Sequence, residues 1–108
     1  MADEGLIWDA ANEAHLTTPR PGQAPVSRAE VDALFDSGQF VPADYEHLNP
    51  DGTWEWQVRL IGRTPAGRLL TVACQIVERH GSERFRPVTA WDAAPAETAL
   101  YRKEISNG

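Results

Sequence analysis

Histidines and arginines are the residues of this chain whose types could carry out proton-transfer and phosphate chemistry. Cleavage of RNA by internal attack needs a group that takes a proton from the 2′-hydroxyl and a group that returns one to the leaving oxygen. It also needs fixed cations to stabilise the phosphate. Histidine and arginine suit these roles. The candidates are His15, His47 and His80 for proton transfer, and Arg59, Arg63, Arg68, Arg84 and Arg86 for phosphate.

Each of these candidates also has a structural interpretation. His47 and His80 stand beside turn signals, which favours solvated turn residues over catalysts. The arginines alternate along predicted strands and fit the solvent face of a sheet. Trp54 and Trp56 fall on one face of a predicted strand, which favours core packing over base stacking.

Charge and spacing exclude several classes of site. The net charge is −6, which argues against a surface that is broadly adapted to nucleic acid. Residues 1–52 contain two arginines against ten acids, whereas residues 53–108 contain eight Lys or Arg against six acids, so an anion site is expected in the second half. The histidines and acids show no metal-ligand spacing, and the glycines form no phosphate-binding loop. We therefore expect no metal and no small-molecule cofactor.

The length of 108 residues predicts a single domain over residues 1–108. Cys74 lies in an apolar run and is expected to pack as a small hydrophobic residue rather than to serve as a reactive thiol. The start of the chain has no basic region followed by a long apolar core, and no apolar run is long enough to cross a bilayer, so we expect no membrane association and a cytoplasmic location.

The residue pattern predicts an α+β fold. A short helix capped by Asp9 is expected to run to about Leu16, followed by a loop over 17–26 that is rich in proline. Ser27 and Glu30 match a capping box, and Gly38 is placed to end that second helix.

The rest of the chain predicts a meander. Strands are expected at Phe40–Tyr45, Trp54–Ile61, Arg68–Glu78 and Phe85–Trp91, with a turn from His47 to Gly52. Pro95 is placed as the first residue of a closing helix. The prediction is an antiparallel sheet of about four strands with two N-terminal helices and a C-terminal helix.

Several segments, in order, resemble the BrnT-like branch of the RelE/ParE-type toxin superfamily. Ile7-Trp8-Asp9 with Asn12 and His15 is similar to the family's opening and first helix. Val26–Phe35 is similar to its second helix, and Gly62–Val72 to its central hairpin. Thr89-Ala90 with Ala93, Glu97 and Tyr101 is similar to its final strand and helix.

The resemblance implies a RelE-like domain and a function. Members of the family are bacterial toxins of type II toxin-antitoxin pairs, metal-independent endoribonucleases that inhibit translation and are neutralised by a cognate antitoxin. The implied partners are that antitoxin and RNA or the ribosome. By position, the implied catalytic residues are His15, Arg63, Arg68, Glu97 and Tyr101. Packing or capping roles are the alternatives for His15, Glu97 and Tyr101.

One position departs from the family pattern. Trp91 stands where the family has an arginine after its serine-alanine pair, and tryptophan can stack or pack but cannot supply a cation. The alternative hypothesis is therefore a non-catalytic module that keeps the toxin fold and binds an antitoxin-like DNA-binding partner. A third hypothesis is an adaptor domain with no toxin partner. Catalysis requires His15, Arg63 and Arg68 to converge on one surface.

Overall fold

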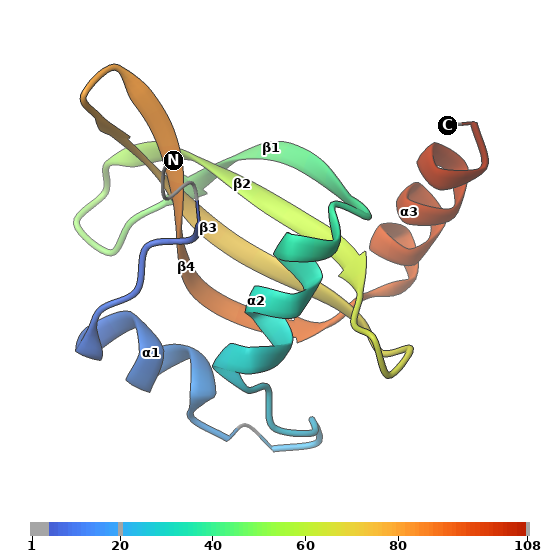
Figure 1. Cartoon of the computed structure of the whole chain (residues 1–108). Helices are drawn as coiled ribbons and strands as arrows, with labels where there is room; N and C mark the ends of the chain where they lie inside the picture. The colour runs from blue at the N-terminus through green and yellow to red at the C-terminus, as the bar shows by residue number, and fades with distance from the viewer. Residues whose placement is uncertain (1–4, 20, 108) are drawn as a thin grey trace.

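The chain folds into a four-stranded antiparallel sheet with helices on both faces (Figure 1). The computed structural model describes residues 5–19 and 21–107. This confirms the predicted α+β class. Among the described residues, no helix combines the length and the apolar character that crossing a membrane requires. The elements in chain order are α1 (Ala10–Thr17), α2 (Arg28–Ser37), β1 (Phe40–Leu48), β2 (Trp54–Arg63), β3 (Leu69–Arg79), β4 (Ser82–Asp92) and α3 (Pro95–Asn107).

The two N-terminal helices begin at the predicted caps. The Asp9 side chain accepts a hydrogen bond from the Asn12 amide, and the Asn12 side chain accepts one from the Asp9 amide. Ser27 and Glu30 make the same reciprocal pair at the start of α2. Gly38 follows α2 with a φ of 71°, a left-handed conformation that glycine adopts without steric cost.

The strands follow one another in the order β1-β2-β3-β4, each paired with the next. His80 and Gly81, with φ values of 54° and 81°, form a two-residue turn between β3 and β4, which confirms the interpretation of His80 as an exposed turn residue. The prediction for β1 was wrong at its end, because the strand continues through His47 to Leu48. The turn runs from Asn49 to Thr53 and is closed by two backbone hydrogen bonds, from the Asn49 amide to the Thr53 carbonyl and from the Gly52 amide to the Asn49 carbonyl.

The main core lies between the sheet and the pair α1 and α2. Alternate residues of β2 and β3 point to this side, which we call the α2 face. Cys74 packs there, as predicted, and its burial raises the pKa of the thiol to about 12. The buried residues of this core include Leu16, Val31, Leu34, Val58, Leu60, Leu70, Val72 and Cys74.

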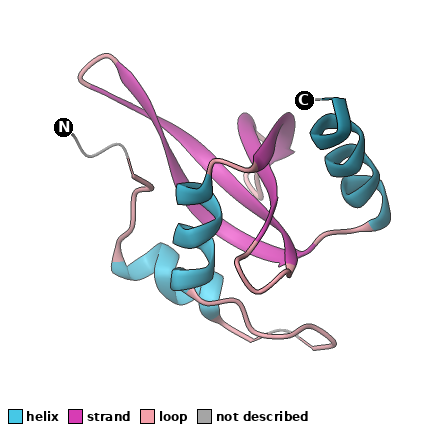
Figure 2. Ribbon diagram, turned by 45° about the vertical axis from the view of Figure 1, so that its right-hand side comes forward, coloured by secondary structure: helices cyan, strands magenta, loops and turns pink. Residues whose placement is uncertain are grey.

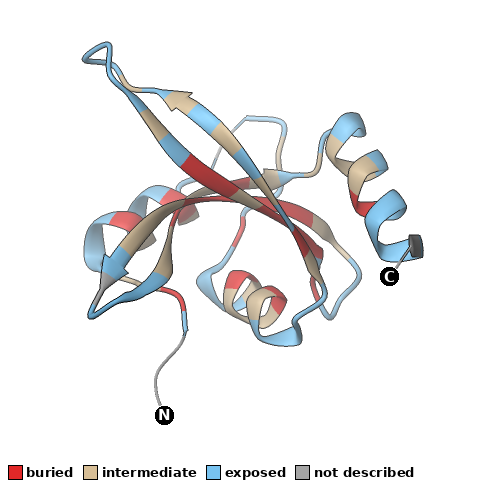
Figure 3. Ribbon diagram, turned by 90° about the horizontal axis from the view of Figure 1, so that it is seen from above, coloured by how far each residue is buried: buried red, intermediate tan, exposed pale blue. Residues whose placement is uncertain are grey.

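The opposite side of the sheet, which we call the α3 face, is covered only at one end. Val41 and Ile61 pack there against Tyr101 of α3. Figures 2 and 3 show α3 standing at one end of the twisted sheet, away from α1 and α2, while the ends of the hairpins extend into solvent. The residues predicted to do chemistry are therefore distributed over two separate faces.

Candidate functional site

His15 and Arg68 lie on the α2 side of the sheet. His15 is exposed on α1, a helix that buries Leu16 in the main core. Arg68 immediately precedes β3 and reaches Glu30 of α2. Arg63 and Tyr101 lie on the α3 face, where the Arg63 guanidinium is 5.8 Å from the centre of the Tyr101 ring. The structure brings Arg63 and Tyr101 together but does not bring His15, Arg63 and Arg68 onto one surface.

Arg68 is held by polar groups from three segments. Its Nε donates to Asp92 Oδ1 at 2.8 Å, and Nη1 pairs with Glu30 Oε2 at 3.4 Å. Its Nη1 and Nη2 also donate to the carbonyls of Pro25 and Ala24, at 2.7 and 2.8 Å. A planar guanidinium suits this fork-like arrangement. Arg68 thereby ties the loop before α2 to the end of β4, and its donors are occupied.

Tyr101 and Arg63 differ in their freedom to meet a ligand. Tyr101 is only 7% exposed and packs with Val41 and Ile61, which is the packing role that the sequence left open for it. Arg63 is exposed, and its Nη1 donates to the Gly67 carbonyl at 3.0 Å. Among the described residues, Arg63 makes no ion pair. Of these two residues, only Arg63 could reach a phosphate.

Glu97 is the centre of a polar cluster between the sheet and α3. Its Oε1 accepts hydrogen bonds from the Thr71 hydroxyl at 2.8 Å, the Trp91 indole at 3.0 Å and the Ala94 amide at 2.8 Å. Its Oε2 pairs with Nη1 of Arg59 at 3.1 Å. The bond from the Ala94 amide is half of a capping box at the start of α3. Glu97 therefore caps α3 and fastens it to the sheet.

These contacts argue against Glu97 as a proton acceptor. Burial raises the pKa of Glu97, but the hydrogen bonds from Ala94, Thr71 and Trp91 and the charge of Arg59 outweigh it, so the pKa is lowered. A general base works best with a pKa near the working pH and with an oxygen free to receive the proton. Glu97 has donors on both oxygens, and its pKa is shifted in the unfavourable direction.

Arg59 supplies the positive charge of this cluster. Its guanidinium lies 4.0 Å from the centre of the Tyr45 ring and 5.3 Å from that of Trp91, and its Nε is buried without a hydrogen-bond partner. Ala43 and Ala73 flank it in register, so small side chains leave room for it to lie across the sheet. The sequence included Arg59 only among the general phosphate candidates. Its contacts depend on cross-strand register, which spacing along the chain does not reveal.

Trp91 fits this cluster through its indole. The indole nitrogen donates to Glu97. The ring, on β4, lies near Arg59 of β2 across the intervening strand β3. Although Trp91 replaces the arginine of the family pattern, Arg59 places a positive charge in the same region. That charge is already paired with the Glu97 carboxylate.

Ion pairs join acids of the first half of the chain to arginines of the second half. Arg68 pairs with Glu30, and Arg86 pairs with Asp9 at 3.0 Å. In both pairs an acid of the first half neutralises an arginine of the second. The described part of the chain also forms no pocket and contains no cluster of His, Cys, Asp or Glu that could hold a metal ion. Two of the arginines that charge counting offered for an anion site, Arg68 and Arg86, are therefore already paired with carboxylates.

The hairpin of β1 and β2 carries a different kind of surface. Trp54 and Trp56 are each 62% exposed, and Leu48, which pairs with Trp54 across the hairpin, is 52% exposed. All three point to the α2 face, because paired residues and alternate residues share a face. We call Leu48, Trp54 and Trp56 the aromatic patch. The prediction that Trp54 and Trp56 belong to the core was wrong.

The position of α2 explains this exposure. A Cβ added at Gly62 would lie 3.1 Å from Cγ of Leu34, so α2 crosses β2 near Gly62. Trp56 is six positions away, about 20 Å along an extended strand. The α2 helix contains ten residues and spans about 15 Å. The strand pattern indicated one apolar face correctly, but the helix that covers it ends before the tryptophans.

Comparison of the chain with protein-family models, curated proteins and solved structures found no match.

Proposed function

We propose that this chain is a non-catalytic protein-binding module that acts through a complex with a dedicated partner. The aromatic patch of Leu48, Trp54 and Trp56 is the observation that carries the proposal. The resemblance to the BrnT-like branch suggests the kind of partner, an antitoxin-like DNA-binding protein. Such a complex would form in the cytoplasm, where a DNA-binding partner acts.

The size of the aromatic patch supports a binding role. A whole tryptophan offers up to about 250 Å² of surface, so the exposed parts of Trp54 and Trp56 together present roughly 300 Å². Leu48 extends this surface across the hairpin. Contiguous apolar patches of this size on a small protein are often functional, because exposing them to water is unfavourable unless a partner covers them. Tryptophan is also enriched among residues that dominate binding energy.

The arrangement of the polar residues supports the absence of catalysis. Arg68 and Glu97 use their polar atoms to join α2 and α3 to the sheet. Tyr101 is packed against Val41 and Ile61 on the α3 face. Catalysis of RNA cleavage needs such groups directed at a reacting phosphate. In this chain Arg68 and Glu97 are instead directed at oppositely charged side chains, Glu30 and Arg59.

The second candidate function is the metal-independent endoribonuclease, a toxin that inhibits translation and is neutralised by its antitoxin. Arg63 favours it, because this exposed guanidinium is bound to a single carbonyl and lies near Tyr101. His15 is exposed but lies on α1, on the other side of the sheet. A ribonuclease would therefore need a proton-transfer group other than His15 beside Arg63.

Three measurements separate these functions: complex formation, growth after induction, and RNA cleavage by the purified chain. We expect a stable complex with the product of the adjacent reading frame, seen by co-expression and size-exclusion chromatography. We also expect no growth arrest on induction and no RNA cleavage. Cleavage that Arg63→Ala abolishes, with Arg102→Ala on α3 as a matched control that retains it, would establish the ribonuclease and refute the binding module.

A further inference from the structure

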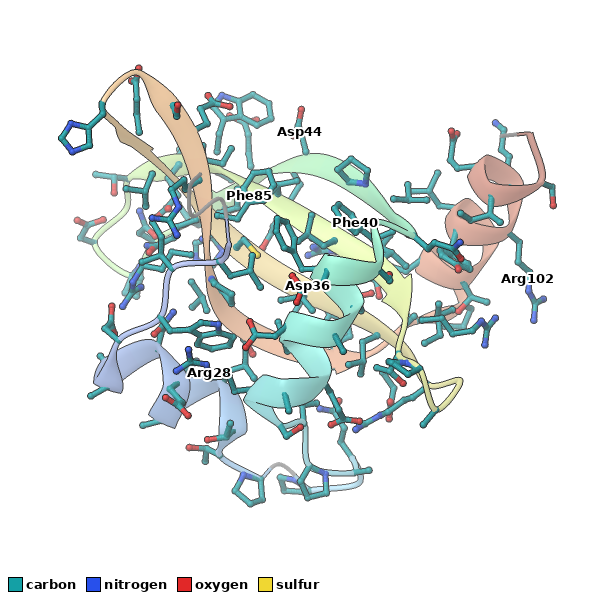
Figure 4. The ribbon with its side chains drawn as sticks, in the orientation of Figure 1. Arg28, Asp36, Phe40, Asp44, Phe85 and Arg102 are labelled. Atoms are coloured by element: carbon teal, nitrogen blue, oxygen red, sulfur yellow. The ribbon has the colours of Figure 1, made fainter. Side chains whose placement is uncertain are left out.

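The β1–β2 hairpin combines the aromatic patch with uncompensated negative charge. Residues 40–58 contain four acids and no lysine or arginine. Asp44 and Glu46 alternate with Tyr45 along β1, and Glu46 pairs in register with Trp56, so these two acids share the face of the tryptophans. Both are exposed, and Figure 4 shows Asp44 projecting outward from β1.

Neither carboxylate forms an ion pair with a described residue. The ion pairs of the described residues use Asp9, Glu13, Glu30, Asp32, Asp92 and Glu97, and none involves Asp44 or Glu46. By contrast, the acids Asp9 and Glu97 each lie beside an arginine. A pair of free carboxylates next to exposed tryptophans is therefore suited to a partner that presents both cations and apolar side chains.

The geometry of the patch favours a helix as the occupant. Trp54 and Trp56 are two positions apart, or about 7 Å along the strand, and Leu48 lies about 5 Å across the hairpin from Trp54. Side chains three or four positions apart on a helix are separated by about 5–6 Å, which lies between these two spacings. Addition of a strand is less suitable, because Pro42 and the charged residues of the edge strand β1 discourage pairing.

We propose that the β1–β2 hairpin binds a cationic amphipathic helix of the partner protein. Apolar side chains of that helix cover Leu48, Trp54 and Trp56, and its lysines or arginines face Asp44 and Glu46. This inference rests on the proposed binding function and specifies the surface and the chemistry of the partner.

The test is a titration of the purified full-length chain with a synthetic amphipathic helix of leucine and lysine, measured by calorimetry. We expect saturable binding that weakens as salt shortens the Debye length from about 10 Å at 0.1 M to about 3 Å at 1 M. Trp56→Ala should weaken binding about 30-fold, the value for a hot-spot residue of about 2 kcal/mol. The double variant Asp44→Asn/Glu46→Gln should weaken binding several-fold and remove most of its salt dependence.

Matched control variants distinguish specific binding at the hairpin from non-specific binding of the helix peptide. Ile105 is 45% exposed on α3, and Glu104 is exposed on the same helix, which packs on the α3 face. Ile105→Ala and Glu104→Gln therefore remove an apolar group and a charge from the side of the sheet opposite the aromatic patch. Both variants should bind as the unchanged chain does. Circular dichroism should show that Trp56→Ala remains folded, because the Trp56 side chain lies largely in solvent.

Several results would overturn the inference. Equal binding of a leucine–glutamate helix would refute the charge argument, and full affinity of Trp56→Ala would refute the surface. Preferential binding to vesicles of anionic lipid would assign the patch to a membrane instead. A complex with the adjacent gene product that survives Trp56→Ala would refute this inference alone, whereas the absence of any complex with the unchanged chain would refute the proposed function itself.

Discussion

Removal of the Glu97 carboxylate should destabilise the fold, because α3 is fastened to the sheet through it. The substitution Glu97→Ala takes the acceptor away from the Thr71 hydroxyl, the Trp91 indole and the Ala94 amide. It also removes the carboxylate that pairs with the Arg59 guanidinium. If Glu97 were instead held for catalysis, its removal would be expected to cost activity and little stability.

The structure sets the magnitude of this loss. The Glu97 side chain is 11% exposed, and Thr71 is fully buried, so their bond is shielded from water. Hydrogen bonds to charged groups contribute about 1.5–3 kcal/mol, and a buried hydroxyl left unpaired adds to the cost. Arg59 is 35% exposed, so water compensates much of its lost ion pair. We expect a loss of about 2–4 kcal/mol from a total stability of about 5–15 kcal/mol.

Urea unfolding followed by circular dichroism measures this free energy directly. At about 4–8 °C per kcal/mol for a domain of this size, the melting temperature should fall by roughly 8–32 °C. The matched control is Glu104→Ala, which removes an exposed carboxylate from the same helix and should change stability by less than about 0.5 kcal/mol. A Glu97→Ala variant as stable as the Glu104→Ala control would refute the role of Glu97 as an anchor.

The pH dependence gives a second test of the same reasoning. Because the pKa of Glu97 is lowered in the folded state, the stability contributed by its charge is present above the unfolded carboxyl pKa of about 4.5 and is lost as the pH falls through the folded value. The stability difference between the unchanged chain and Glu97→Gln should therefore narrow in acid. A difference that stays constant from neutral pH to pH values well below 4 would contradict the assigned shift.

Three further predictions concern buried positions. Asn12→Ala should cost about 2–4 kcal/mol in urea unfolding, because this nearly buried amide donates to the carbonyls of Ile7 and Pro87 and also caps α1; full stability would contradict that role. The Cys74 thiol, with its pKa raised to about 12 by burial, should resist alkylation until urea unfolds the chain, and rapid alkylation of the native chain would show that it is accessible. Gly62→Ala should cost roughly 1–3 kcal/mol, since its Cβ would lie 2.9 Å from that of Phe40, whereas Gly5→Ala has open space and should be neutral in the same thermal scan.

Local signals in the sequence predicted most of the fold. The capping residues Asp9 and Ser27 and the terminating Gly38 interact with residues three or four positions away. Both partners of each interaction are therefore visible in a short stretch of sequence. Pro95 likewise begins α3 as predicted. The error at the end of β1 arose because His47 and Leu48 stand beside a strong turn signal, yet cross-strand pairing with Glu55 and Trp54 extends the strand through both.

The candidate site could not be predicted in the same way, because it depends on contacts between distant segments. The exposure of Trp54 depends on where α2 ends above the sheet, and alternation along one strand contains no such information. The partners of Arg68 lie 24 to 44 positions away in the chain. Counting charges in each half predicted an anion site, but it could not show that Glu30 would fold onto Arg68.

The distribution of polar and apolar groups reverses the usual expectation for a small enzyme. Active sites generally keep polar groups partly unsatisfied inside a concave pocket, whereas apolar side chains line the walls. In this chain Arg59 and Arg68 each serve as a junction between a helix and the sheet, and Glu97 completes the first junction. These polar groups therefore contribute mainly to architecture.

The surface left for interaction is apolar and acidic, at the end of the hairpin that no helix covers. Substitution of Arg68 or Glu97 should then impair any function in proportion to the stability that is lost, whereas substitution of Trp56 should impair complex formation with the fold intact. A measured contrast of this kind would separate the binding role that we propose for the hairpin from the structural role of the residues to which the family resemblance pointed.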